Sequence, residues 1–294
     1  MVVDVILQYL RLIRIRQWYK NLVIFLPLIF GKQLFNLFSV QQTIIGFFAL
    51  SLISSSNYIL NDIKDREKDK LHPVKRYRPI ASGKISVFSA SITGLIFFAG
   101  GMLLSASLST LFAFFALSLF LSTQLYTFIL KNEAFADIIN ISVNFVIRTI
   151  AGAFVIAKGF EPYVEVSAWL ILCPFFVALF LAAAKRHKEV KALKQGAEAH
   201  RAVLKVYSEK MCFALLIIST TLLVISFSLY VIFSPYQGMI YTIPFVLYLI
   251  LRFFSLVVQE DLITNRLDLI YKDRGILFAG GLICMITLFA VYFM

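Results

Sequence analysis

The sequence predicts an all-α membrane protein with nine transmembrane helices, and three observations lead to this fold class. Only 15% of the 294 residues are charged, whereas soluble domains carry about 25%. Nine largely apolar stretches reach the roughly 20 residues that are needed to cross a bilayer. Backbone groups in lipid must be hydrogen-bonded within their own segment, and the period-2 alternation of barrel strands is absent, so the stretches are expected to be helices.

The order of these stretches suggests one integral-membrane domain over residues 1–294. The stretches cover residues about 18–36, 39–61, 86–107, 109–130, 136–157, 166–185, 211–234, 238–258 and 275–294. Two long polar loops, 62–85 and 186–210, each follow the second helix of a four-helix set. Stretches one to four and five to eight are therefore candidates for divergent repeats, with the ninth added.

The 28 Lys and Arg residues are distributed unevenly, and this predicts the orientation in the membrane. If nine helices alternate, both basic loops and the cations before the first stretch lie on the N-terminal side, while Lys32 and Lys158 lie opposite. By the positive-inside rule, the N-terminal side faces the cytoplasm across the inner (plasma) membrane, and we expect the active site there. The net charge of +12 suits anionic membrane lipids and phosphorylated ligands, and we expect no nucleic-acid partner.

An acidic motif, "NDIKDREKD", ends the second stretch. Asp62, Asp65 and Asp69 are spaced i, i+3, i+7, which places them within about 60° of one another on a helix, with Asn61 at the shoulder. Carboxylates on one face repel unless a cation lies between them, and Mg²⁺ or Mn²⁺ prefers such oxygen ligands. The alternative is a solvated helix end whose acids balance basic neighbours. Asn57 extends the polar face into the bundle, which favours a metal site.

Two groups of cations near this motif are candidate phosphate ligands. Lys75, Arg76 and Arg78 follow it directly, and arginine binds phosphate oxygens in pairs. Arg16 and Lys20 precede the first stretch at i, i+4 and would share a helix face. The alternative for the first group is a clamp on lipid headgroups, and for the second an interfacial anchor beside aromatic residues.

The fifth stretch carries a polar face along its length. Asp137, Asn140, Asn144 and Arg148 are spaced 0, 3, 7 and 11 residues apart, which aligns them on a helix. Ionisable groups inside a membrane line a cavity or pair with each other. An interhelical hydrogen-bonded stripe is the alternative, and we favour a polar cavity.

Further candidates lie at the ends of the fourth and sixth stretches, on the predicted cytoplasmic side. Tyr126 and Lys131 end the fourth stretch, and Lys185 and Arg186 open the second basic loop. No Cys or His cluster indicates a transition-metal site.

The motif "NDIKDREKD" fits the pattern N-D-x-x-D-x-x-x-D and resembles the UbiA superfamily of intramembrane prenyltransferases, which are nine-helix proteins. "RIRQWYKN", "NDIKDREKDKLHPVKRYRPIASG", "YTFILK" and "KRHKE" resemble the branch of decaprenyl-phosphate phosphoribosyltransferases. This resemblance implies a UbiA-like bundle that transfers 5-phosphoribose from phosphoribosyl diphosphate to a polyprenyl phosphate, a step toward cell-wall arabinan. Loop 186–210 has no Asp, whereas typical superfamily members carry a second acidic motif there. Its extra cations would offset the additional phosphates of these substrates.

The resemblance also assigns roles to the candidates. Asn61, Asp62, Asp65 and Asp69 would hold Mg²⁺ on the donor diphosphate. The proposed substrate ligands are Arg16, Lys20, Asn57, Lys75, Arg76, Arg78, Tyr126, Lys131, Asn144, Arg148, Lys185 and Arg186. An aromatic prenyltransferase that uses a prenyl diphosphate donor is one rival, and a non-enzymatic lipid carrier is another. The sequence leaves the prenyl chain length, the choice of Mg²⁺ or Mn²⁺ and the oligomeric state open.

Overall fold

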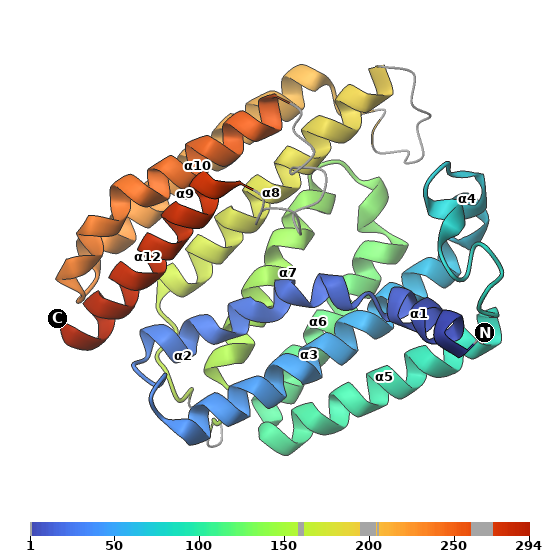
Figure 1. The fold of residues 1–294 in the computed structure, drawn as a ribbon, viewed down its shortest axis with the longest axis horizontal. Helices are drawn as coiled ribbons and strands as arrows, with labels where there is room; N and C mark the ends of the chain where they lie inside the picture. The colour runs from blue at the N-terminus through green and yellow to red at the C-terminus, as the bar shows by residue number, and fades with distance from the viewer. Residues whose placement is uncertain (1, 158–161, 195–203, 205, 260–272) are drawn as a thin grey trace. The chain divides into compact units, whose positions relative to one another are not determined.

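The computed structural model describes residues 2–157, 162–194, 204, 206–259 and 273–294. Every regular element in this part of the chain is helical (Figure 1). In chain order the elements are α1 (Val2–Ile13), η1 (Ile15–Phe25), α2 (Leu26–Phe30), α3 (Leu37–Lys64), α4 (Arg66–Leu71), η2 (Lys75–Tyr77), α5 (Val87–Leu108), α6 (Thr110–Phe128), η3 (Leu130–Asn132), α7 (Ala136–Ala153), α8 (Ala168–Lys194), α9 (Glu209–Phe233), η5 (Gln237–Thr242), α10 (Ile243–Val258) and α12 (Arg274–Phe293).

Eight helices among the described residues are long and apolar enough to cross a membrane, so the chain is a multi-pass membrane protein. They correspond to eight of the nine predicted stretches. The first stretch, 18–36, differs: it is the 3₁₀ helix η1 followed by the short helix α2. Arg14, with φ 53°, separates η1 from α1. Pro27 lies in the first turn of α2, where a proline ring costs no helical hydrogen bond. The prediction of nine regular spanning helices therefore holds for eight.

The chain divides into two compact units, which are described separately. The first comprises residues 1–28, 33–131 and 147–166, and the second comprises 29–32, 132–146 and 167–294. The boundary falls inside α7, so this helix contributes to both units.

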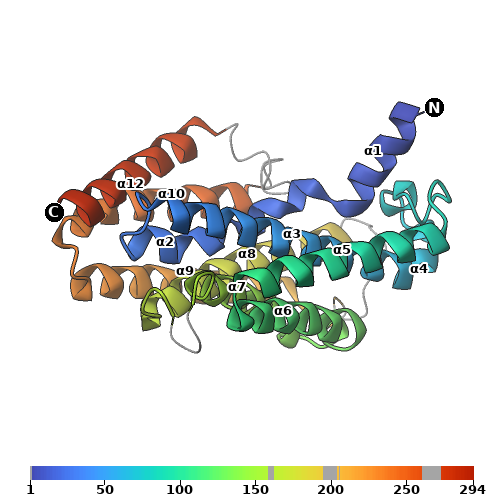
Figure 2. The ribbon, with the colours of Figure 1, turned by 90° about the horizontal axis from the view of Figure 1, so that it is seen from below.

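In the first unit, α3 lies alongside α5 and also packs against α6 (Figures 1 and 2). The buried core is apolar: Ile24, Ala49, Leu50, Ile53, Phe112, Ala116, Leu119, Ala151 and Val155. Small residues allow close backbone approach here. A Cβ on Gly152 would lie 2.4 Å from the carbonyl oxygen of Ile24, and one on Gly101 would lie 2.7 Å from Ile53. Such close contacts are typical of membrane helices, which associate largely through van der Waals packing.

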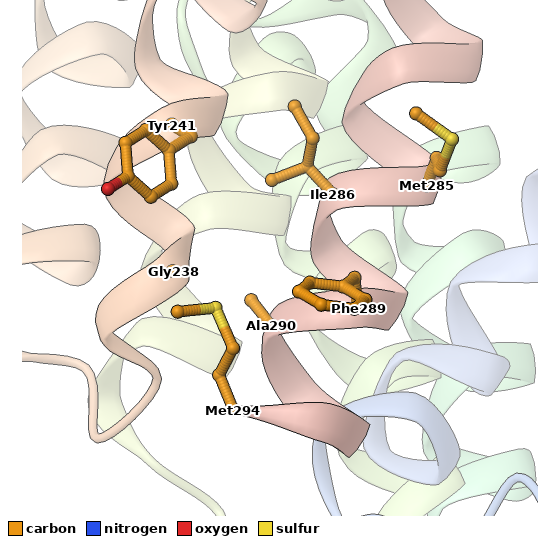
Figure 3. Close-up of a pocket in the computed structure, with 7 residues that line it drawn as sticks. All are labelled: Gly238, Tyr241, Met285, Ile286, Phe289, Ala290 and Met294. Atoms are coloured by element: carbon orange, nitrogen blue, oxygen red, sulfur yellow. The ribbon is translucent and has the colours of Figure 1, made fainter.

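In the second unit, α8 packs along α9, and α10 packs against α12. Their shared core is Phe180, Ala184, Leu216, Leu223, Ile250, Phe253, Leu256, Val257 and Ile276. A cavity of about 430 Å³ lies between η5 and α12, lined by Gly238, Tyr241, Met285, Ile286, Phe289, Ala290 and Met294 (Figure 3). No charged side chain lines it, and Met285 and Phe289 are exposed. Its lining suits lipid chains, so the candidate site for phosphorylated ligands lies elsewhere.

Candidate active site

The acidic motif lies where α3 passes into α4. Asp65 occupies the junction, with φ −88° and ψ 5°, so one continuous helix does not run through the motif. Backbone hydrogen bonds nevertheless carry the helical path across it, from Asp65 N to Asn61 O at 2.9 Å and from Asp69 N to Asp65 O at 2.8 Å. The i, i+7 relation of Asp62 and Asp69 therefore survives the break, and both carboxylates turn inward.

Asp62 and Asp69 converge on one guanidinium group. Both residues are buried, at 3% and 4% exposure. Nη1 of Arg78 donates to Asp62 Oδ1 at 2.9 Å and to Asp69 Oδ2 at 2.6 Å. Nη2 of Arg14, which lies between α1 and η1, donates to the same Asp62 oxygen at 2.6 Å. Two carboxylates thus share one cationic nitrogen, and two arginines balance their charge.

Asp65 has a different partner. Its Oδ1 accepts a hydrogen bond of 2.6 Å from Nζ of Lys131, which lies in η3 just after α6. The sequence predicted Asp65 and Lys131 as site residues without predicting that they meet. The predicted trio is therefore arranged as a pair around Arg78, with the third carboxylate on Lys131. Across the described residues, no three His, Cys, Asp or Glu side chains form a metal-binding group.

The pair around Arg78 has the donor chemistry that a divalent cation requires. Two buried carboxylates converge on a single position that a positively charged group already fills, and Asn61 stands one residue before Asp62. Burial raises the pKa of the Asp69 carboxyl, although the charge and hydrogen bond of Arg78 oppose this shift. A cation at this position would favour the ionised carboxylates. Asp62 and Asp69 therefore fit Mg²⁺, whereas Asp65 is paired with Lys131, and the metal-binding role of the motif stays a prediction.

The cations before the first stretch do not share a face as predicted. Because η1 is a 3₁₀ helix with three residues per turn, Arg16 and Lys20 point about 120° apart. Arg16 is exposed, whereas Lys20 is half-buried and interacts electrostatically with Tyr58 of α3. The guanidinium of Arg14 lies 4.8 Å from the centre of the same ring. The prediction of a shared face is therefore wrong. Arg14, which was not among the predicted site residues, contacts the acidic motif.

Arg148 belongs to a buried hydrogen-bond network in the first unit. Its Nε donates to Asn21 Oδ1 at 2.8 Å, and Asn21 Nδ2 donates to Ser51 Oγ at 3.0 Å. Asn57 accepts a short hydrogen bond from Gln124. These bonds join η1, α3, α6 and α7, so Arg148 takes part in an interhelical hydrogen-bond network, which is the alternative to a polar cavity.

The remaining candidate ligands range from exposed to buried. Lys75 is half-buried, and Arg76 is exposed and donates to the hydroxyl of Tyr77 at 2.8 Å. Tyr126 lies half-buried on α6. Asn144, which lies in the second unit, is buried on α7.

A second buried ionic cluster lies within the second unit. Arg186 is 1% exposed, and its Nε donates to Asp137 Oδ2 at 2.7 Å while Nη1 forms a very short bond with Glu189. Tyr207 donates to Asp137 Oδ1 at 2.7 Å and accepts from the backbone N–H of Phe135 at 2.7 Å. Burial raises the pKa of Tyr207.

This cluster changes how the second basic loop is interpreted. The charge of Arg186, predicted to bind substrate, is directed to interior carboxylates, whereas the Lys185 side chain is 63% exposed. Tyr207 was missed because nothing in its sequence surroundings distinguishes it from an ordinary loop tyrosine. Residues 195–203 and 205 of this loop lie outside the described residues.

The helices and the carboxylate–guanidinium site define an all-helical, multi-pass membrane protein with a polar centre at one end of α3. Residues 25–266 match the model of the UbiA prenyltransferase family, and the chain belongs to this family of transferases.

Known proteins resemble the chain in sequence and in fold. It is 37% identical over 177 residues to the protein y4nM of Sinorhizobium fredii, which covers 60% of the chain but only 33% of that relative. It is 31% identical over 230 residues to the decaprenyl-phosphate phosphoribosyltransferase of Mycolicibacterium smegmatis, covering 75% of the chain and 69% of the relative. A UbiA homologue from Archaeoglobus fulgidus bound to GPP and Mg²⁺ has the same fold, with a TM-score of 0.71 and 18% identity over 98% of this chain and all of that one.

Proposed function

We propose that the chain transfers 5-phosphoribose from phosphoribosyl diphosphate to a polyprenyl phosphate and releases diphosphate, with Mg²⁺ or Mn²⁺ as the cofactor. The observation that carries this proposal is the pair of buried carboxylates, Asp62 and Asp69, around the partly exposed Arg78. Carboxylates for a metal and arginines for phosphate are the two ligand sets that a sugar diphosphate requires. The relative from Mycolicibacterium smegmatis is named decaprenyl-phosphate phosphoribosyltransferase, and this name supports the same substrate class.

The chain's own residues would orient the donor. Arg78 contacts both carboxylates, and Lys75 of η2 interacts electrostatically with Asp69, so both cations would bind the leaving diphosphate. When bound, Mg²⁺ would add positive charge at this diphosphate. Lys131, already fixed on Asp65, holds the ribose side of the site. Asp62, Asp65 and Asp69 act as ligands and counter-charges and transfer no proton.

The reaction then balances without a general base. The bond between C1 of ribose and the diphosphate oxygen breaks, and its electron pair leaves with the diphosphate. An oxygen of the lipid phosphate forms the new bond to C1 from the opposite face, which inverts the anomeric centre. Because this phosphate is already an anion, no proton must be removed, and the acidic motif needs no catalytic histidine.

The charge of the second basic loop favours two phosphorylated substrates over a prenyl diphosphate donor. It carries eight Lys and Arg residues between Lys185 and Lys210 and no Asp. A positive field of this kind attracts multiply charged anions. Arg186 is paired with Asp137, so we assign it a supporting role, whereas the Lys185 side chain is exposed to solvent.

A product assay tests the proposal. The full chain in lipid nanodiscs is incubated with isotopically labelled phosphoribosyl diphosphate, decaprenyl phosphate and Mg²⁺, and the lipid product is identified by mass spectrometry. We expect a labelled phosphoribosyl lipid, at least ~100-fold less of it with Asp62→Asn, and an unchanged amount with Lys70→Gln, whose exposed side chain pairs only with Glu67 among the contacts seen. Absence of the lipid product with the intact chain would refute the donor assignment.

An aromatic prenyltransferase is the second candidate. The Archaeoglobus homologue of the same fold is bound to GPP, a prenyl diphosphate. A parallel incubation with geranyl diphosphate and a hydroxybenzoate distinguishes the two, because only this reaction yields a prenylated aromatic.

The cytoplasmic position of the site is likewise proposed. A cysteine is placed at the exposed position of Lys70, and its reaction with a membrane-impermeant reagent in oriented vesicles would test this position.

A further inference from the structure

Arg78 fills the position that the proposed metal would need. Its Nη1 lies 2.9 Å from Asp62 and 2.6 Å from Asp69, and the two carboxylate side chains are only 4% and 5% exposed. With Arg14 also on Asp62, two positive charges balance two negative charges. A divalent cation added to this set would leave a net charge of two, next to a guanidinium that repels it.

The loop that carries Arg78 is fixed, while its side chain has a route outward. Ile80 is 1% exposed and packs in a core cluster with Leu12 and Ile59. The N–H of Ser82 donates to the carbonyl of Arg78 at 2.9 Å, and Gly83 completes the turn with φ 75°, a conformation that glycine adopts without strain. The Arg78 side chain is 27% exposed. It can therefore leave the carboxylates by rotation about its own bonds, without movement of the loop.

We infer that Arg78 is an exchangeable counter-ion: it neutralises Asp62 and Asp69 until the divalent cation and the donor bind, and it then transfers its hydrogen bonds to the donor diphosphate. This inference rests on the proposed function, and it adds an order to the binding events. The cation alone must displace a positive charge and binds weakly. The cation together with a diphosphate binds tightly, because the anion receives the displaced guanidinium.

Mn²⁺ binding to the purified full chain in detergent tests this exchange without any turnover. Free Mn²⁺ is measured by its electron paramagnetic resonance signal, with and without inorganic pyrophosphate, at free Mn²⁺ levels corrected for chelation. For the intact chain we expect pyrophosphate to tighten Mn²⁺ binding by about 5- to 150-fold. Arg78→Gln should bind Mn²⁺ alone about tenfold more tightly, and pyrophosphate should then add less than about threefold.

Two matched variants make the result specific. Lys70→Gln, like Arg78→Gln, removes one positive charge from the polar loop 62–85, but Lys70 does not contact the carboxylates. This variant should therefore bind Mn²⁺ and pyrophosphate as the intact chain does. Arg78→Lys keeps the positive charge and should retain weak Mn²⁺ binding and strong coupling; if it binds Mn²⁺ alone as tightly as Arg78→Gln, the exchange of charge is refuted. If Arg78→Gln does not fold, Arg78→Lys is compared with the intact chain instead, and loss of the pyrophosphate coupling in Arg78→Lys would refute the exchange.

The failure of this inference can be distinguished from the failure of the proposed function. If Asp62→Asn and Asp69→Asn abolish Mn²⁺ binding while Arg78→Gln leaves both affinities unchanged, the metal site stands and the exchange is refuted. If Mn²⁺ binding ignores both aspartate substitutions, the metal site itself is refuted, and the exchange with it.

Discussion

Replacing Arg186 by methionine should destabilise the protein by about 3–5 kcal/mol, the cost of leaving one member of a buried ion pair without its partner. The side chains of Arg186 and Asp137 are 2% and 0% exposed, so water cannot replace the lost contact. Among the described residues, Asp137 would keep the hydroxyl of Tyr207 at 2.7 Å and the N–H of Ile138 at 2.9 Å. Two neutral donors do not compensate a buried carboxylate charge.

The double variant Asp137→Leu/Arg186→Met should recover most of this loss, because it removes both charges and fills similar volume. Equilibrium unfolding in mixed micelles, followed by circular dichroism, gives the four free energies of a double-mutant cycle. Lys185→Met is the control, since its exposed ammonium lies 4.0 Å from Glu189 and should contribute less than about 1 kcal/mol. A double variant no more stable than Arg186→Met alone would refute the buried-pair argument.

Three further predictions concern packing, pH and capping. Gly152→Ala should lower the free energy of unfolding by about 1–3 kcal/mol, because its Cβ would lie 2.4 Å from the Ile24 carbonyl oxygen. Gly280 has open space around it, so Gly280→Ala should be neutral or stabilising. Thermal unfolding of both variants checks this. Burial raises the pKa of Asp69, so its contribution to the free energy of unfolding falls as the pH rises from the usual carboxyl range through the raised pKa. Asp69→Asn should therefore reduce the pH dependence of the unfolding free energy, measured by unfolding curves across this pH range. Asp273 caps α12 through Ile276 N at 2.9 Å, so Asp273→Ala should lose about 0.5–2 kcal/mol, and Asp273→Asn should lose less in the same unfolding assay.

Hydropathy was sufficient to predict the helical part of the fold. Eight of the nine apolar stretches are spanning helices, because length and apolar content decide what can cross a bilayer. The first stretch passed the same test and is instead a 3₁₀ helix and a short α-helix. Composition does not distinguish these backbones, and the i, i+4 argument for Arg16 and Lys20 failed for this reason.

The sequence predicted Asp62, Asp69 and Arg78 as members of the candidate site but predicted neither Arg14 nor the pairings. Helical spacing brought Asp62 and Asp69 together, since that relation is local and survives the junction at Asp65. The partners come from distant parts of the chain: Arg14 precedes the first stretch, and Lys131 follows α6. Spacing along one helix carries no information on such contacts. Tyr207 was missed for the same reason, because it meets Asp137 only through the tertiary fold.

Within the described residues, the Arg78 and Arg186 clusters both hold buried carboxylates, and the exposure of the arginine separates their roles. The Arg186 side chain is 2% exposed and paired with the fully buried Asp137, so we assign this pair a structural role. The Arg78 side chain is 27% exposed, although the carboxylates it bridges are as buried as Asp137. A charge pair that is closed to solvent resists exchange, whereas one that is open on the cation side can trade its partner for phosphate. Substitution of Arg186 should therefore lower the free energy of unfolding while Mn²⁺ affinity stays unchanged in the folded fraction. Substitution of Arg78 should change Mn²⁺ affinity and its coupling to pyrophosphate, and equal effects of both substitutions on that coupling would contradict this division.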